Sequence, residues 1–221
     1  AAHEALGIED LLVKQNSMGL TSAQNNWIDA WTQIDEPDNA QWNAQTQTYG
    51  PCISPSTLTT EYNNIKANDS TRPVFLNFGQ GVVYTNNWPG RGSCTGNHNT
   101  YYPQAIQAGD IISYDIYPVN DGWQLEDVAE GLENLKTWAA GQSNKVIWNF
   151  IEASSINGTA LPTVSQVKAE VWMSLIHGSK GIGYFVHEFN PFREDGIFNH
   201  PALVTGVKQI NDQILSLAPV L

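Results

Sequence analysis

The sequence predicts an α/β fold of the (β/α)8 TIM-barrel type, with about six β/α units, so that the barrel is incomplete or reduced. Strand-like and helix-like segments alternate along the chain. The strand-like segments are apolar throughout, which is typical of parallel strands buried on both faces. No glycine-rich dinucleotide-binding turn follows any of them, and this favours a barrel over a doubly wound sheet.

The expected strands are short apolar runs, and two of them stop at a proline. Proline has no N–H to donate to a sheet ladder, so one strand must end before Pro37 and another before Pro118. In order, the six expected strands cover residues 8–15, 27–34, 72–78, 110–117, 145–151 and 181–188.

Helices are expected between the strands, marked by caps or by apolar spacing. Ser54 is an N-cap residue, and Pro55 after it fits the first turn of a helix. Residues 125–140 carry apolar side chains at the spacing of one helical face. Residues 79–102 are expected to form a long loop, a kind of segment that is usually functional or disordered. The expected helices cover residues 2–6, 55–68, 125–140, 163–177 and 201–217.

The composition indicates a single domain, residues 1–221, whose charge would not repel a neutral substrate. With 221 residues, 41% of them hydrophobic, the chain can bury one well-packed core. Asp and Glu total 22 against 10 for Lys and Arg, a formal net charge of -12. Such a surface repels nucleic-acid phosphates and anionic lipid headgroups, so we expect neither a nucleic-acid nor a membrane partner.

The cysteine content indicates an oxidising compartment. Cys52 and Cys94 are an even pair in an acidic, Lys-poor chain, which favours a disulfide in a secreted, extracellular protein; the alternative is two unrelated buried thiols. The five histidines lack the spacing of metal ligands, so we expect no metal and no cofactor. No Gly-x-Ser-x-Gly motif is present, which argues against an esterase.

Two of the expected strands end in a glutamate, Glu36 and Glu152. Glycoside hydrolysis needs one carboxylic acid to protonate the departing oxygen and a second carboxylate across the anomeric carbon. We expect burial to raise the pKa of the acid and hydrogen bonds to keep the nucleophile ionised. The alternative is that each glutamate only pairs with a surface cation.

These strand endings resemble those of the clan A (β/α)8 glycoside hydrolases, a group that includes β-galactosidase-like and cellulase-like barrels. Residues 35–37 (Asp-Glu-Pro) resemble the Asn-Glu-Pro motif of strand four, and residues 151–153 (Ile-Glu-Ala) resemble the end of strand seven. Residues 178–185 resemble the passage from helix seven to strand eight. The resemblance covers nearly the whole chain and implies a retaining β-glycoside hydrolase, with Glu36 as acid/base and Glu152 as nucleophile.

The chain departs from this family in two ways. Asp35 replaces the asparagine that bonds the sugar 2-hydroxyl, and it cannot donate an amide proton. If residues 27–34 are strand four, the first two strands are missing and an open arc would expose sheet edges. Another copy covers those edges, or the chain is a fragment of a longer protein, or a reduced barrel closes differently.

Further side chains at strand ends are expected to face the same mouth and bind substrate. Tyr117 is placed to hydrogen-bond the nucleophile, and tryptophans are placed to stack on sugar rings, although strand capping and core packing are equally good interpretations. Glu188 either binds substrate or pairs with Arg193. The expected substrate-binding residues are Asn16, Asp35, Asn77, Trp88, Asp115, Tyr117, Trp148 and Glu188.

The predicted function is therefore a retaining glycoside hydrolase that cleaves β-glycosidic bonds of a polysaccharide or oligosaccharide. The competing prediction is a catalytically silent, carbohydrate-binding partial barrel, and a weaker one is a different hydrolase that uses the same two carboxylates.

Overall fold

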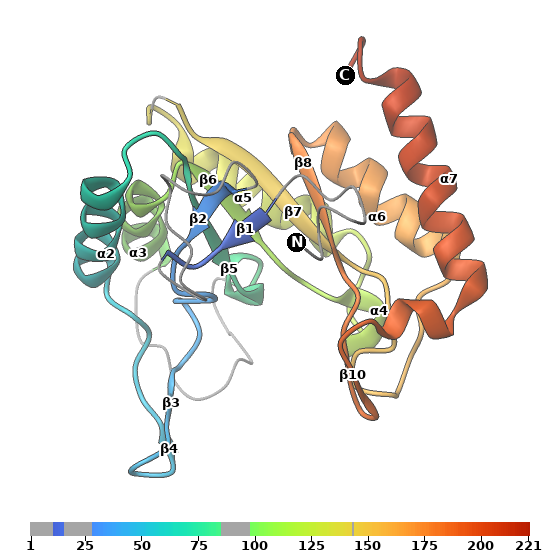
Figure 1. Cartoon of the computed structure of the whole chain (residues 1–221), viewed down its shortest axis with the longest axis horizontal. Coiled ribbons are helices and arrows are strands. Elements are labelled where there is room, and N and C mark those ends of the chain that lie inside the picture. The colour runs from blue at the N-terminus through green and yellow to red at the C-terminus, as the bar shows by residue number, and fades with distance from the viewer. Residues whose placement is uncertain (1–10, 16–27, 85–97, 143) are drawn as a thin grey trace. The chain divides into compact units, whose positions relative to one another are not determined.

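The computed structural model describes residues 11–15, 28–84, 98–142 and 144–221, and the statements below concern these residues (Figure 1). The expected helix over residues 2–6 and most of the expected long loop lie outside them. Within them, strands and helices alternate as predicted.

The main sheet has six strands in the order β1-β2-β5-β6-β7-β8, which is also their order in the chain. The pairs β1–β2, β2–β5 and β7–β8 are parallel. Each strand lies within the expected segment except at the end of β7, where Glu152 itself is part of the strand. The bounds are β1 Leu11–Val13, β2 Ile28–Thr32, β5 Val74–Phe78, β6 Ile111–Tyr114, β7 Val146–Glu152 and β8 Gly181–Phe185.

From β2 to β8, helices lie between successive strands of the main sheet, which confirms an α/β fold of the incomplete TIM-barrel type. The helices are α2 Pro55–Asn68, α3 His98–Ala105, α4 Pro118–Asp121, α5 Asp127–Ala139, α6 Val164–Ile176 and α7 Pro201–Leu217, with short 3-10 turns η3 Gln80–Val82, η4 Ile106–Ala108 and η5 Gly196–Asn199.

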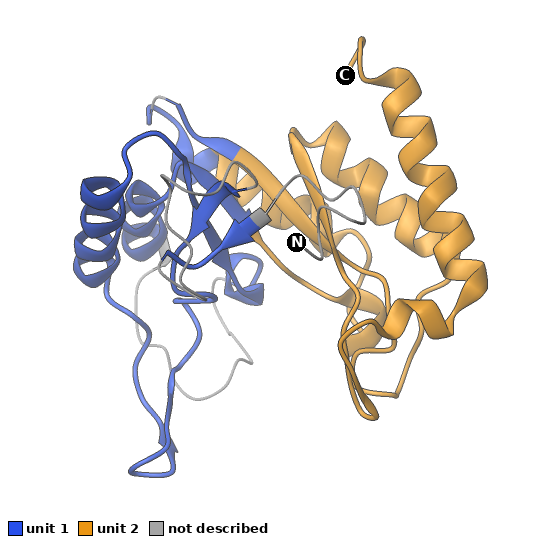
Figure 2. Cartoon of the chain, viewed as in Figure 1, with its two compact units in different colours: residues 1–113, 137–146 blue, residues 114–136, 147–221 orange. Residues whose placement is uncertain are grey.

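The chain divides into two compact units (Figure 2). Unit 1 comprises Ala1–Ser113 and Thr137–Val146, and unit 2 comprises Tyr114–Lys136 and Ile147–Leu221. Each unit is described by itself below.

Unit 1 packs α2 against the strands that carry the candidate site. Ser54 caps α2 by accepting a hydrogen bond from the backbone N–H of Thr57, as expected from the Ser-Pro start. Gln33 follows β2 and is buried, and its amide nitrogen donates to the backbone oxygens of Leu58 and Ala108 at 2.9 and 3.1 Å. One side chain thereby ties the end of β2 to α2 and η4.

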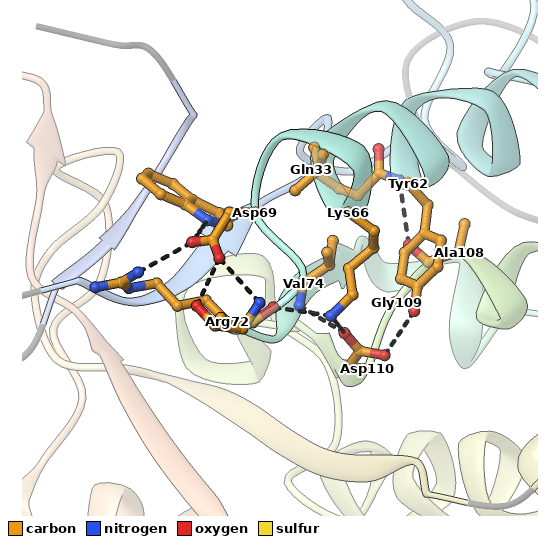
Figure 3. Close-up of polar contacts among 12 residues, drawn as sticks. Gln33, Tyr62, Lys66, Asp69, Arg72, Val74, Ala108, Gly109 and Asp110 are labelled. Carbon is orange, nitrogen blue, oxygen red and sulfur yellow. Dashed lines mark hydrogen bonds and ion pairs between the residues drawn. The ribbon is translucent and has the colours of Figure 1, made fainter. Parts of the chain in front are cut away.

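A network of buried charges holds the entry to β5 (Figure 3). The Asp69 carboxylate accepts from Trp31 Nε1 at 2.8 Å and pairs with Arg72 at 3.0 Å. Burial alone would raise the pKa of Asp69, but the hydrogen bonds from Thr71, Trp31 and Arg72 outweigh it and lower the pKa. The carboxylate is therefore ionised and fully paired.

A second carboxylate in Figure 3, Asp110, accepts from Tyr62 and from the N–H of Val74, both at 2.9 Å, and pairs with Lys66 at 3.4 Å. Burial alone would raise its pKa, yet these partners lower it. Together the two networks join α2 to the starts of β5 and β6.

The segment expected to be a long loop contains a helix at its end. Helix α3 begins at His98, and its Tyr102 ring stacks on Trp138 at a centroid distance of 4.3 Å. Tyr102 also packs edge-on against Phe78 of β5 at 5.3 Å. The sequence of α3 is short and aromatic, and it lacks the apolar spacing that would have predicted a helix.

Unit 2 packs α6 and α7 against β7 and β8. Thr163 and Gln166 form a capping box at the start of α6. Gly181 and Gly183 of β8 lie against the rings of Trp148 and Phe150, so that any larger residue there would collide with β7. The core between strands and helices is built from Ile151, Ala153, Val167, Val171, Ile197, Leu203 and Ile210.

Two short antiparallel ribbons were not predicted. One pairs β3, Trp42–Asn43, with β4, Thr48–Tyr49, and the other pairs β9, Glu188–Phe189, with β10, Phe192–Arg193. The expectation that Glu188 ends the sixth main strand is wrong, because β8 stops at Phe185. Strands this short carry no measurable periodicity.

Candidate active site

Glu36 lies in unit 1, in the loop that follows β2. Its backbone has φ 40°, in the left-handed region that non-glycine residues adopt at a cost of about 1–3 kcal/mol. The N–H of Glu36 donates to the backbone oxygen of Asn77 at 3.0 Å, which holds the loop against the end of β5. Strain of this kind is typical of positions where side-chain orientation matters.

The Glu36 carboxylate is half-buried and oriented by its neighbours. Asn39 Nδ2 donates to Oε2 at 2.6 Å. A Cβ placed on Gly79 would lie 3.0 Å from Oε1, so the glycine leaves room for the carboxylate. The side chain thus has a defined position and a partly open face.

Asp38 is a buried carboxyl beside Glu36. It accepts from the N–H of Gly79 and from the Tyr102 hydroxyl, both at 2.8 Å. Burial raises the pKa of Asp38 to about 7; the hydrogen bonds from Gly79 and Tyr102 oppose the rise, and the charge of Glu36 adds to it. Near neutral pH, the Asp38 carboxyl beside Glu36 therefore changes between its protonated and its ionised form.

Asp35, in the loop after β2, lies beside Asn77 of β5. Asp35 is exposed, and its Oδ1 accepts from Asn77 Nδ2 at 3.2 Å. The other amide atom of Asn77, Oδ1, is buried and has no hydrogen-bond partner among the described residues. The structure thus brings together four polar side chains of unit 1 around Glu36: Asp35, Asp38, Asn39 and Asn77.

Glu152 ends β7 in unit 2 and is 0% exposed. Its carboxylate accepts from the backbone N–H groups of Val119 at 2.6 Å and Asn120 at 2.9 Å, and from Asn120 Nδ2 at 2.5 Å. Asn120 is itself fixed, since its amide also bonds Ser154 and Ile156. Burial raises the pKa of Glu152. The hydrogen bonds from Asn120 and Val119 lower it, but by less than burial raises it.

Glu170 of α6 is a second buried carboxyl beside Glu152. Both of its oxygens are buried, and no donor from the described part of the chain reaches them. Burial raises the pKa of Glu170 to about 9, and the charge of Glu152 adds to the rise. Burial thus favours the protonated form of Glu170 at neutral pH.

An aromatic cluster lies in unit 2 around the end of β8. The Phe185 ring is 5.1 Å from the ring of Tyr117, and His187 packs edge-on against Phe189 at 4.4 Å and Phe192 at 4.8 Å. Phe189 and Phe192 are largely exposed. The cluster offers ring faces and edges of the kind that pack against the C–H groups of a sugar.

The remaining expected site residues have partners of their own. Tyr117 donates to Asp115 at 3.0 Å. Glu188 is buried, 2.7 Å from His200 and 3.6 Å from Arg193, the ion pair expected as the alternative to substrate binding. Trp148 is half-buried in β7. Substrate contacts by these residues stay predictions.

Three expected residues, Asn16, Trp88 and Cys94, lie outside the described residues. Cys52 is half-buried, with its Sγ 2.7 Å from the backbone oxygen of Asp38. Its pairing with Cys94 stays a prediction.

Reasoning from the sequence missed Asp38, Asn39, Asn120 and Glu170. Asp38 and Asn39 follow the glutamate directly in the chain, so the turn after Pro37 was a usable signal. Asn120 and Glu170 gave none, because only the packing of α4 and α6 brings them to Glu152.

Comparison with known proteins identifies the fold. No protein-family model and no curated protein matches the sequence. Among solved structures, a Bacteroides thetaiotaomicron protein assigned as an alpha-L-fucosidase matches with a TM-score of 0.56 at 10% identity, over 86% of this chain and 58% of that one. The glycoside hydrolase family 17 beta-1,3-glucanosyltransferase of Rhizomucor miehei matches with a TM-score of 0.50 at 11% identity, over 88% and 73%.

The chain has an incomplete (β/α)-barrel fold that is similar to the folds of these two proteins. At these identities the similarity concerns the fold alone, and the chain spans 58% of the length of the first match. The predicted resemblance to clan A barrels is confirmed at the level of fold. Within the described residues, no helix has the length and apolar character needed to cross a bilayer, and no group of three metal-ligating side chains is placed to hold an ion.

Proposed function

We propose that the protein is a retaining glycoside hydrolase that cleaves β-glycosidic bonds of a polysaccharide or oligosaccharide. The observation that carries this proposal is that Glu36 follows the carboxyl end of β2 and Glu152 is the last residue of β7, in a sheet whose fold is similar to that of glycoside hydrolases. Barrel enzymes place their catalytic groups at that end of the strands.

Glu36 is the proposed acid/base. Its carboxylate is half-buried, and the amide of Asn39 holds one of its oxygens by a hydrogen bond. Asp35, in the loop after β2, and Asn77 of β5 are hydrogen-bonded to each other and are the proposed contacts to sugar hydroxyls.

Glu152 is the proposed nucleophile. Its three donors, two backbone N–H groups and the Asn120 amide, orient the carboxylate and favour its ionised form. Attack requires that form, so the burial that raises the pKa of Glu152 places the acidic limb of kcat/KM above the pH expected for a free glutamate.

The proposed reaction has two steps. Glu36 gives its proton to the departing oxygen while Glu152 attacks the anomeric carbon, which breaks the glycosidic bond and forms a glycosyl ester. Glu36 then removes a proton from water, whose oxygen attacks the same carbon and releases Glu152 as a carboxylate. The product keeps the configuration of the substrate.

The substrate class follows from charge and from the aromatic cluster. The net charge of -12 disfavours anionic substrates, and the exposed rings of Phe189 and Phe192 suit neutral sugars. A polysaccharide of neutral sugars that lies outside cells is in keeping with the predicted secretion. A second copy that covers the open sheet edges stays a prediction.

Active-site variants and covalent trapping test the proposal. Glu36→Gln and Glu152→Gln are expected to lower kcat by about 10²–10⁴-fold or more on aryl β-glycosides, whereas Glu194→Gln, at an exposed position, serves as the matched control. A 2-deoxy-2-fluoro-β-glycoside should add one sugar to the peptide that contains Glu152, as read by mass spectrometry. Saccharide binding without turnover by the wild-type protein, or a label on another residue, would refute the assignment.

A further inference from the structure

The β3–β4 ribbon of unit 1 presents two aromatic side chains to solvent. Trp42 is 55% exposed and Tyr49 is 43% exposed, although both are large and apolar. They are direct cross-strand partners, with ring centroids 5.0 Å apart and an interplanar angle of 61°. In Figure 1 the ribbon extends away from the strands and helices of its own unit.

The segment of the chain that carries these rings contains no charged residue. No Asp, Glu, Lys or Arg occurs from residue 39 to residue 60, in a chain whose net charge is -12. The ribbon residues beside the rings are amides and hydroxyls: Gln41, Asn43, Gln45, Thr46, Gln47 and Thr48. A charged macromolecule finds no complementary charge here, whereas a neutral polyhydroxylated chain finds ring faces together with donors and acceptors.

The ribbon is preorganised by its own hydrogen bonds. Asn43 Oδ1 accepts from the N–H groups of Gln45 and Thr46 at 2.9 and 3.0 Å and so closes the turn. The hydroxyls of Thr46 and Thr48 lie 2.8 Å apart. A surface that is already ordered loses little conformational entropy when it binds.

The ribbon is also joined to the loop that carries Glu36. Gln41 Nε2 donates to the backbone oxygens of Glu36 at 3.3 Å and Asn39 at 2.8 Å, and the Gln41 backbone oxygen accepts from the N–H of Gly50 at 2.7 Å. The base of the ribbon and the candidate acid/base thus belong to one hydrogen-bonded segment.

We propose that Trp42 and Tyr49 form a binding platform for a chain of neutral sugars, separate from the residues that cleave it. The platform binds a stretch of polysaccharide, its rings packed against sugar C–H groups and its amides and hydroxyls bonded to sugar hydroxyls. This inference rests on the proposed function and deepens it: the substrate is a polymer of neutral sugars.

Binding and kinetics on matched substrates test the platform. Trp42→Ala, Tyr49→Ala and the double variant are compared with Phe198→Ala, which removes an exposed aromatic residue from η5 in unit 2. Each is measured for depletion from solution by cellulose, β-1,3-glucan, chitin and xylan, with polygalacturonate as the charged comparator.

The double variant is expected to bind the preferred neutral polymer about tenfold more weakly, while Phe198→Ala binds like the wild type. Its KM should rise more on that polymer than on an aryl glycoside. Glu36→Gln should bind the polymer as the wild type does, so a failure of catalysis is told apart from a failure of the platform.

Three results would overturn the inference. The first is wild-type protein that binds none of the neutral polymers, and the second is a double variant that binds them undiminished. The third is a change of sedimentation velocity in Trp42→Ala that reveals the loss of a dimer, because the rings would then cover a second copy.

Discussion

Replacing Glu170 by glutamine removes the ionisable group of the buried carboxyl beside Glu152 and keeps its shape. The side chain is 0% exposed, and burial raises its pKa from 4.5 to about 9. In the unfolded chain the same carboxyl is ionised above about pH 4–5. Folding at neutral pH must therefore take up a proton, and this uptake opposes folding.

The size of the effect follows from the two pKa values. The folded-state pKa is the higher one, so stability falls as pH rises from the unfolded value towards about 9. Each pH unit in that window costs about 1.4 kcal/mol. The penalty is about 1 kcal/mol at pH 5 and about 3 kcal/mol at pH 7. Glutamine has the same shape and does not titrate, so it carries no such penalty.

Glu170→Gln should therefore raise the free energy of unfolding by about 3 kcal/mol at pH 7 and by about 1 kcal/mol at pH 5. Urea denaturation at a series of pH values from 5 to 8 measures both quantities, and Glu194→Gln is the exposed control. A gain that is the same at every pH, or a loss of stability at pH 7, would refute the reasoning.

Two further substitutions probe packing and charge. Gly131→Ala would place a Cβ of α5 against the ring of Tyr114, so we expect a loss of about 1–3 kcal/mol by urea denaturation; a gain, the usual result of Gly→Ala in a helix, would contradict this. Asp69→Asn weakens the bonds to Trp31 and Arg72 and should cost about 2–4 kcal/mol at pH 7. The folded-state pKa of Asp69 is lowered, so its ionised form stabilises the fold above about pH 4. The difference in free energy of unfolding between the wild type and Asp69→Asn should therefore shrink as pH falls towards 2. A difference that does not change with pH would show the reasoning to be wrong.

The sequence determined the elements whose signals are local. Helix α7 has the predicted bounds because Pro201 begins it, and α2 and α6 begin where Ser54 and Thr163 cap them. Capping residues and prolines act within one turn of backbone, so a helix start that they mark can be predicted from the sequence alone. The alternation of strand-like and helix-like segments can also be read directly from the sequence, and it predicted the fold class.

The tertiary structure decided the surroundings of the candidate catalytic groups. Glu152 was visible at the end of an apolar run, but the amide of Asn120 and the carboxyl of Glu170 reach it from helices distant in sequence. The pKa of a buried carboxyl depends on which groups exclude water from it and which charges face it. Those neighbours are chosen by packing, and sequence spacing alone does not encode them.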